Sequence, residues 1–119
     1  MQADSATRIR GMLGFAMRAG KLAIGADAVC SALGRRGLVK LVVICPDASE
    51  GSKKKVNTKC AFYGVAAMEL PFGMSELGRL LGKSFAPATV AITDEGFARE
   101  IEKCGALLTN ERSSSEEER

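Results

Sequence analysis

Histidine and tryptophan are absent from this chain, and the other aromatic residues are few, with five phenylalanines and one tyrosine. Histidine is the most frequent general base in catalysis and the most frequent metal ligand, so its absence removes the commonest designs of both kinds of site. The shortage of aromatic rings argues against a surface that stacks many single-stranded bases. The composition thus disfavours a catalytic or metal-binding protein before any motif is considered.

Cysteine pairs are also missing. The four cysteines form no C-x-x-C pair, and their spacings match no zinc-ligand pattern. Each lies in or beside an apolar stretch, so we interpret all of them as small buried hydrophobic residues. They are Cys30, Cys45, Cys60 and Cys104.

Nucleotide-binding loops and catalytic constellations are absent from the sequence as well. It contains neither a phosphate-binding G-x-x-x-x-G-K-S/T loop nor a dinucleotide fingerprint. Asp47, Asp94 and Glu95 follow expected strands, where active sites of α/β proteins gather, but capping of helices is the favoured interpretation. We therefore predict no catalytic residue, no metal site and no cofactor.

Long apolar runs do not occur. No stretch approaches the roughly 18 apolar residues that cross a bilayer, and Met1 to Ser5 is polar, without the apolar core of a signal peptide. A chain of 119 residues can bury about two-thirds of its unfolded surface in a single domain without disulfides. We predict a cytoplasmic protein that has no membrane partner and is a monomer.

Positive charge is concentrated in one half of the chain. From Arg8 to Lys59, eleven lysines and arginines stand against three acidic residues, whereas from Cys60 to Arg119 six basic residues stand against ten acidic ones. A small domain that gathers its positive charge in this way usually presents it to a polyanion. The same basic stretch is rich in glycine, so the backbone can approach a ligand closely there.

The spacing of apolar residues predicts an alternation of helices and strands. Helices are expected at 5–19, 26–36, 49–63, 75–81 and 95–104, with Ser75 and Asp94 capping the last two and a glycine ending each. Strands are expected at 38–45, 65–70 and 88–93, with a short extended link at 21–24. This order predicts the α/β class, as a three-layer α/β/α sandwich around a mixed sheet of about four strands.

The end of the chain differs in composition from the rest. From Glu111 it is rich in serine and glutamate and has nothing to bury. We expect residues 111–119 to form a disordered tail and residues 1–110 to form the single domain.

Three local motifs point to anions, each with a plainer alternative. A helix beginning just after Gly25 would offer unpaired N–H groups to a phosphate, with Arg18 and Lys21 upstream; the alternative is a simple corner with solvated charges. The cluster Lys53-Lys54-Lys55 with Lys59 is either a phosphate-contacting surface or a solvated helix face. Gly34-Arg35-Arg36-Gly37 has the G-x-x-G form of a backbone-clamping loop, but the end of a helix explains its glycines equally well.

Four stretches, taken in order and spacing, resemble a known family. The chain is similar to the ribosomal protein family named for the large-subunit proteins seven-Ae and thirty-e, and most of all to its small bacterial YlxQ-like branch. The resemblance runs from about Arg8 to Lys103. The stretches that carry it are Gly14–Leu22, Asp47–Gly64, Glu76–Lys83 and Ala91–Ala98.

This resemblance implies an α/β/α sandwich that binds structured RNA, often a kink-turn, whose sheared G·A pairs open the edges of the guanines. In the family, a Gly-x-Asn-Glu-x-x-Lys pattern at the start of the second helix reads those pairs. Here Gly25 matches, while Asp27, Ala28 and Ser31 replace the Asn, Glu and Lys. An ionised aspartate cannot donate a hydrogen bond and alanine makes no polar contact, so each lost base contact removes about 1–3 kcal/mol of discrimination.

From the resemblance we predict a noncatalytic RNA-binding protein, within a ribonucleoprotein assembly, whose partner is a structured RNA of ribosomal or kink-turn-like type. The start of the second helix approaches the RNA groove, and a loop rich in apolar residues packs on an extruded nucleotide. The alternative is a protein–protein interaction module that keeps the fold with reduced RNA specificity. The predicted RNA-binding residues are Lys21, Gly25, Ala26, Asp27, Ala28, Ser31, Lys83, Ser84, Phe85, Ala86 and Pro87.

Overall fold

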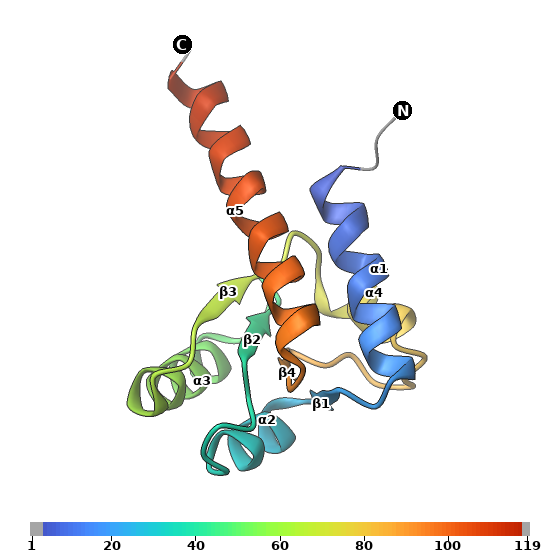
Figure 1. Ribbon diagram of the computed structural model, residues 1–119, viewed down its shortest axis with the longest axis vertical. Coiled ribbons are helices and arrows are strands. Elements are labelled where there is room, and N and C mark those ends of the chain that lie inside the picture. The colour runs from blue at the N-terminus through green and yellow to red at the C-terminus, as the bar shows by residue number, and fades with distance from the viewer. Residues whose placement is uncertain (1–3, 118–119) are drawn as a thin grey trace.

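The computed structural model describes residues 4–117, apart from the side chains of residues 109–117. Five helices and four strands alternate along this part of the chain (Figure 1). The helices are α1 (Ser5–Arg18), α2 (Ala26–Leu33), α3 (Glu50–Tyr63), α4 (Met74–Leu80) and α5 (Glu95–Glu117). The strands are β1 (Leu22–Ile24), β2 (Leu41–Ile44), β3 (Ala67–Glu69) and β4 (Thr89–Ile92).

The four strands form one mixed sheet in the order β1-β4-β2-β3. Strand β4 runs antiparallel to both β1 and β2, whereas β2 and β3 are parallel. All residues of the two central strands, β2 and β4, are buried, because both faces of the sheet are covered. Their uninterrupted apolar sequence is the pattern expected of such strands.

Helices cover the sheet in two layers, and successive residues of β2 point into different layers. Leu41 and Val43 lie in one core cluster with residues of α1, α4 and α5. Val42 and Ile44 lie in the other, with residues of α2 and α3. Figure 1 shows the two groups on opposite sides of the strands. The predicted three-layer α/β/α sandwich with a four-stranded mixed sheet is confirmed.

Side-chain caps fix the starts of three helices. Asp4 Oδ1 accepts from Thr7 N at 2.8 Å, Ser49 Oγ accepts from Ser52 N at 3.1 Å, and Asp94 Oδ2 accepts from Phe97 N at 3.0 Å. Such caps satisfy backbone donors that the helix leaves unpaired. The capping interpretation of Asp94 is therefore confirmed.

The predicted start of α4 is wrong. Ser75 lies inside the helix, and the N-cap is Gly73, which has no side chain to offer. The missing cap is supplied from a distance, since Asp47 Oδ1 accepts from Met74 N at 3.0 Å. Asp47 thus ties the turn after β2 to the start of α4, a long-range contact that local sequence rules do not reveal.

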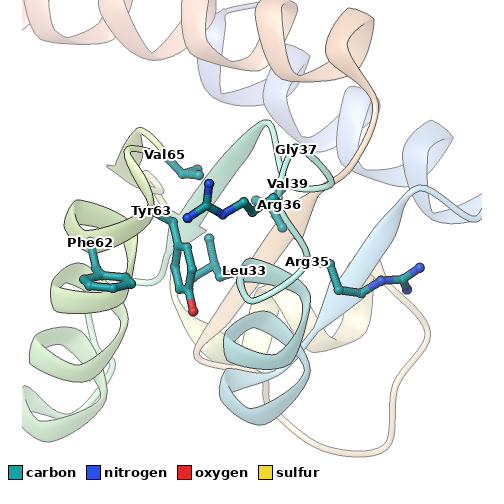
Figure 2. Close-up of a pocket in the computed structure, with 8 residues that line it drawn as sticks. All are labelled: Leu33, Arg35, Arg36, Gly37, Val39, Phe62, Tyr63 and Val65. Carbon is teal, nitrogen blue, oxygen red and sulfur yellow. The ribbon is translucent and has the colours of Figure 1, made fainter.

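The predicted end of α2 at Arg36 is also wrong, because the helix stops at Leu33. The chain then makes a tight turn, seen in Figure 2, in which Leu38 N donates to Arg35 O at 3.0 Å. Within this turn Gly37 has a φ of 79°, a conformation that glycine adopts without steric cost. The G-x-x-G motif is therefore a helix end followed by a glycine turn.

Helix α5 does not end at Gly105, as predicted, but continues to Glu117. A Cβ atom at Gly105 would lie 2.8 Å from Met68 Cε, so the glycine gives room to a side chain of β3 instead of ending the helix. The backbone of residues 111–117 thus extends α5. Their side chains and residues 118–119 lie outside the described part of the chain, and the disorder expected of 111–119 in solution stays a prediction.

Among residues 4–117, the helices include none with the length and apolar character that a bilayer crossing requires.

Candidate nucleic-acid interface

The pairing of β1 with β4 brings the start of α2 next to the loop that precedes β4. Ile24, the last residue of β1, is opposite Val90 in the antiparallel register. Gly25 N then donates to Thr89 O at 2.9 Å. The loop 83–88 leads directly into Thr89, so it arrives at the same end of the sheet. Two segments that are far apart in the sequence thereby share one edge of the molecule, as the resemblance implied.

The N-terminus of α2 is open. Gly25 is its N-cap, with φ 99° and ψ 155°, and within residues 4–117 no side chain accepts a hydrogen bond there. This backbone conformation is essentially restricted to glycine. The first N–H groups of an uncapped helix carry partial positive charge and suit an anion. Asp27 and Ala28 are exposed beside this helix end, and Ala26 is half-buried. Ser31 is exposed as well but lies farther along α2, two residues before the helix ends at Leu33.

Asp27 does not occupy those N–H groups. Its side chain is fully exposed, and one carboxylate oxygen lies 3.9 Å from Lys55 Nζ on α3. An exposed pair at this distance contributes little to stability. It does, however, set a lysine from the basic cluster beside the α2 terminus, where it offsets the charge of the aspartate. The sequence alone gave no indication of this pairing.

The loop 83–87 lies against α4 and frames a shallow hollow of about 300 Å³. Phe85 is exposed over 53% of its surface although it is a large apolar residue. Ala86 and Ser84 are exposed as well, and Lys83 is half-buried. An exposed ring in a hollow edged by basic side chains is suited to stacking on a base.

Pro87 differs from the rest of the predicted apolar contact, since it is buried at the base of the loop. Cys45 Sγ donates to Pro87 O at 3.7 Å and Cys45 N donates to Ala88 O at 2.8 Å. Burial and the nearby Asp47 carboxylate raise the pKa of the Cys45 thiol to about 12, so it is a neutral group. Cys45 and Pro87 therefore support the loop from beneath, while Phe85 and Ala86 form its outer surface.

Three residues of α4 that were not predicted as site residues line the hollow, namely Ser75, Gly78 and Arg79, and the last two shape it. Arg79 lines it with Lys83 and supplies a second positive charge. Gly78 lets the loop pack on α4, because a Cβ atom there would lie 2.6 Å from Phe85 O. Both belong to the stretch Glu76–Lys83, whose resemblance to the family was the only signal in the sequence that could have found them.

Lys21 is not brought together with the other predicted residues. Its carbonyl accepts from Thr93 N at 2.9 Å, which places it beside the end of β4, whereas Gly25 pairs with the start of β4. The length of β1 therefore separates Lys21 from the loop 83–87. The side chain of Lys21 is exposed at that other end of the strand.

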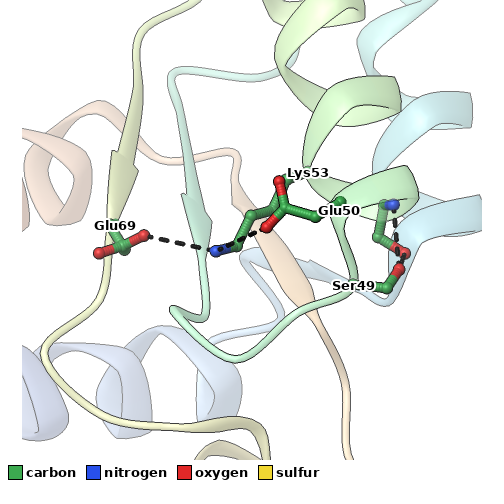
Figure 3. A network of polar contacts seen from close by, with 5 residues as sticks. Ser49, Glu50, Lys53 and Glu69 are labelled. Carbon is green, nitrogen blue, oxygen red and sulfur yellow. Dashed lines mark hydrogen bonds and ion pairs between the residues drawn. The ribbon is translucent and has the colours of Figure 1, made fainter.

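The basic cluster on α3 contains one lysine that is largely covered by the fold and three that are exposed. Lys53 Nζ lies 4.0 Å from Glu50 and 3.9 Å from Glu69, and its side chain is only 25% exposed (Figure 3). Its charge is thus offset by acids of the same molecule. Lys54, Lys55 and Lys59 are exposed and extend the positive surface along α3.

Comparison with known proteins adds the decisive observation. The family model for the Ribosomal protein L7Ae/L30e/S12e/Gadd45 family matches residues 7–102. The chain belongs to this family. The resemblance stated from the sequence is thereby confirmed, and it covers both segments of the edge described above.

Curated relatives place the chain near one branch of the family. It is 40% identical to the RNA-binding protein YlxQ of Bacillus subtilis (strain 168) over 90 residues, which cover 76% of this chain and 87% of the relative. It is 39% identical to the RNA-binding protein YlxQ of Enterococcus faecium over 93 residues, covering 77% and 85% of the two chains. The family and these names support the noncatalytic class predicted from the sequence.

Solved structures agree on the fold. A protein of unknown function from Bacillus halodurans C superposes with a TM-score of 0.74 at 31% identity, covering 81% of this chain and 94% of that one. The 15.5kD RNA binding protein of Giardia lamblia superposes with a TM-score of 0.69 at 15% identity, covering 92% of each chain. At 15% identity the similarity to the Giardia lamblia protein is evidence for the fold alone.

Proposed function

We propose that this member of the family is a noncatalytic RNA-binding protein that recognises structured RNA of kink-turn-like or ribosomal type. The contact lies at the edge formed by the N-terminus of α2 and the loop 83–86. The observation that carries this proposal is the convergence of an uncapped helix start at Gly25 with a basic hollow under an exposed Phe85. The names of the YlxQ relatives support the same class of ligand.

The chemistry of the edge favours shape over base identity. The N–H groups at the start of α2 and the small side chains of Ala26 and Ala28 allow RNA backbone to approach closely. Arg79, Lys83 and Lys55 supply positive charge around this approach. Asp27 lacks the donors of the family's asparagine, so fewer direct contacts to guanine edges are available. Phe85 offers a ring to a base that leaves the helix.

The proposal includes the setting of this activity. Sharply bent RNA occurs in ribosomal and other ribonucleoprotein assemblies, so we propose that the chain acts within such an assembly. We also propose that it is a monomer and that it is located in the cytoplasm. Size-exclusion chromatography with light scattering checks the monomer, and a stable dimer in the absence of RNA would contradict it.

Alanine variants of the hollow test the proposed contact. Lys83→Ala is expected to weaken binding of a labelled kink-turn RNA and to lower the slope of log affinity against log salt by about 1, as loss of one phosphate contact does. Phe85→Ala is expected to cost about 1–3 kcal/mol of binding free energy if the ring stacks on one base. Phe85→Tyr keeps an aromatic face and should bind as the parent does.

Lys103→Ala is the matched charge control, because Lys103 is exposed on α5 and lies outside the proposed edge. It should leave the affinity nearly unchanged. Equal effects of Lys83→Ala and Lys103→Ala, together with no effect of Phe85→Ala, would remove the loop from the site. If neither Lys83→Ala nor Phe85→Ala weakened RNA binding, and the chain instead bound a protein partner tightly, the result would support a protein–protein interaction module.

A further inference from the structure

A second hollow lies at the far ends of α2 and α3, away from the edge described above. Its volume is about 390 Å³, and it lies between the turn after α2 and the last residues of α3. Figure 2 shows Arg36 extending over this hollow toward Tyr63 and Val65, with Phe62 beside Tyr63 and Arg35 pointing away. The G-x-x-G motif therefore forms one wall of the hollow, a role that the proposed RNA edge does not use.

The hollow has an unusual aromatic wall for a chain so poor in aromatic residues. Phe62 is 81% exposed, the largest exposure of any bulky apolar side chain in the part of the chain that the structure describes. Tyr63 meets it edge-on, with ring centroids 4.9 Å apart and an interplanar angle of 88°. Val56 and Cys60, in contrast, are the buried residues of α3. The core therefore does not account for Phe62, whose ring is free to stack on a planar ligand.

The charged side chains of the two segments that form this aromatic wall and the neighbouring turn are all positive. The segments 28–46 and 51–68, which supply the wall and the turn, contain no aspartate or glutamate. Arg35 and Arg36 line the hollow, Lys40 lies close to the same turn in the sequence, and Lys59 precedes Tyr63 by one helical turn. Lys40 Nζ donates to Gly37 O at 2.8 Å, which keeps its ammonium group at the turn. A ligand in the hollow meets a field that favours anions.

We propose that this hollow is a second nucleic-acid site, which binds one nucleotide of a single-stranded RNA segment. The base stacks on the Phe62 ring next to Tyr63, and the phosphate lies at the Arg36 guanidinium. Stacking on an aromatic face accepts any base, and the planar guanidinium pairs with phosphate through two parallel hydrogen bonds. An acidic peptide would satisfy the charge but would leave the exposed ring without a planar partner, so RNA fits both features better.

The second site is spatially distinct from the proposed edge for structured RNA. The eight residues of α2 span about 12 Å, and they separate Gly25 at one end from the turn at the other. The exposed Lys55 and Lys59 lie along α3 between the two ends. The inference does not depend on kink-turn recognition, because single-stranded RNA can be tested without any folded RNA.

The only tyrosine of the chain offers a reporter for this hollow alone. Tyr63 is the single tyrosine in the sequence, so replacing it with 3-fluorotyrosine gives one protein fluorine signal in NMR. A single-stranded RNA of about eight nucleotides, a length within the site sizes known for single-strand binding, is titrated into the labelled full chain. We expect the fluorine resonance to shift with saturation, and the same curve to appear in fluorescence anisotropy of labelled RNA.

Variants then assign the contact. Phe62→Ala is expected to weaken binding of the single-stranded RNA by about 5- to 150-fold, the range of one lost stacking contact, and Phe62→Trp should restore it. Arg36→Ala should weaken it by about tenfold or more, as loss of a charge-assisted phosphate contact does. Arg35 also lines the hollow, but its guanidinium points away from it in Figure 2. Arg35→Ala therefore removes the same charge without removing the proposed phosphate contact and should have a much smaller effect.

Three results would overturn the proposal. The first is RNA binding that does not shift the fluorine resonance of Tyr63 and that has the same affinity in Phe62→Ala as in the parent. The second is an equal effect of Arg35→Ala and Arg36→Ala, which would indicate a diffuse charge effect. The third is an equal or larger fluorine shift with oligoglutamate, which would assign the hollow to an acidic protein partner. None of these bears on the edge at Gly25, since Lys83→Ala and Phe85→Ala test that edge separately.

Discussion

Gly78 is the residue at which the structure makes its sharpest quantitative prediction. A Cβ atom at this position would lie 2.6 Å from Phe85 O, 3.3 Å from Pro87 Cδ and 3.4 Å from Ala86 Cα. The nearest of these atoms is backbone, so the added methyl group cannot be accommodated by rotating a side chain. In Gly78→Ala, either α4 or the loop that carries the proposed nucleotide contact has to move.

The magnitude follows from two opposing terms. Replacing glycine by alanine inside a helix stabilises a protein by about 0.5–1 kcal/mol. Overpacking by one methyl group costs about 1–3 kcal/mol. Gly11→Ala measures the stabilising helix effect without the overpacking cost, because Gly11 is exposed in α1 and has nothing within 4 Å of its ideal Cβ position. The free energy of unfolding of Gly11→Ala should therefore exceed that of Gly78→Ala by about 1–3 kcal/mol.

Urea unfolding followed by circular dichroism measures the difference, and titration of a labelled kink-turn RNA measures the position of the loop. We expect Gly11→Ala to be slightly more stable than the parent and to bind RNA equally well. Gly78→Ala should be less stable than Gly11→Ala and should bind the RNA more weakly. If both variants were equally stable and bound RNA equally, the loop would not be packed on α4 as described, and the reasoning would be refuted.

Three further predictions concern the backbone of Gly25, the helix cap at Asp94 and the buried thiol of Cys45. Gly25→Ala should lower the free energy of unfolding by about 1–3 kcal/mol, because its φ of 99° is strained for any other residue; equal urea midpoints for variant and parent would contradict this. Asp94→Ala should cost about 0.5–2 kcal/mol through loss of its cap at Phe97 N, with Asp94→Asn retaining most of the stability. Burial raises the pKa of Cys45 to about 12 from 9.0, so the unfolded chain releases this proton first and stability should fall as the pH rises from about 9 toward 12. Cys45→Ala should flatten this alkaline decline in urea titrations, whereas an unchanged slope would show that the thiol does not contribute.

Much of the fold could be predicted because its signals are local. The apolar run at Leu41–Ile44 predicts a strand covered on both faces, and the i, i+3, i+4 spacing of Ile9, Leu13 and neighbouring residues predicts the buried face of α1. Two of the errors involve residues that are distant in the sequence. Asp47 accepts from Met74 N and so caps α4 in place of Ser75, and Gly105 lies inside α5, where its missing Cβ atom leaves room for Met68 of β3.

Some parts of the candidate site could be predicted from the sequence and others could not. The local sequence predicts that α2 starts after Gly25, and the family resemblance identified the loop 83–87. The pairing of β1 with β4, which joins the two segments and leaves Lys21 at the other end, depends on the sheet order. The burial of Pro87 and the approach of Lys55 to Asp27 likewise depend on tertiary packing, which the spacing of residues in one sequence does not encode.

The central claim, that the edge at Gly25 and the loop 83–86 recognises the shape of a structured RNA, is tested most directly by one titration. The purified chain is titrated into a labelled kink-turn RNA and into a control RNA in which the G·A pairs are replaced by Watson–Crick pairs, each at low and at moderate salt. We predict tighter binding to the kink-turn at both salt concentrations, with the preference surviving as both affinities fall. Equal affinity for the two RNAs at both salt concentrations, or binding to neither, would contradict the claim.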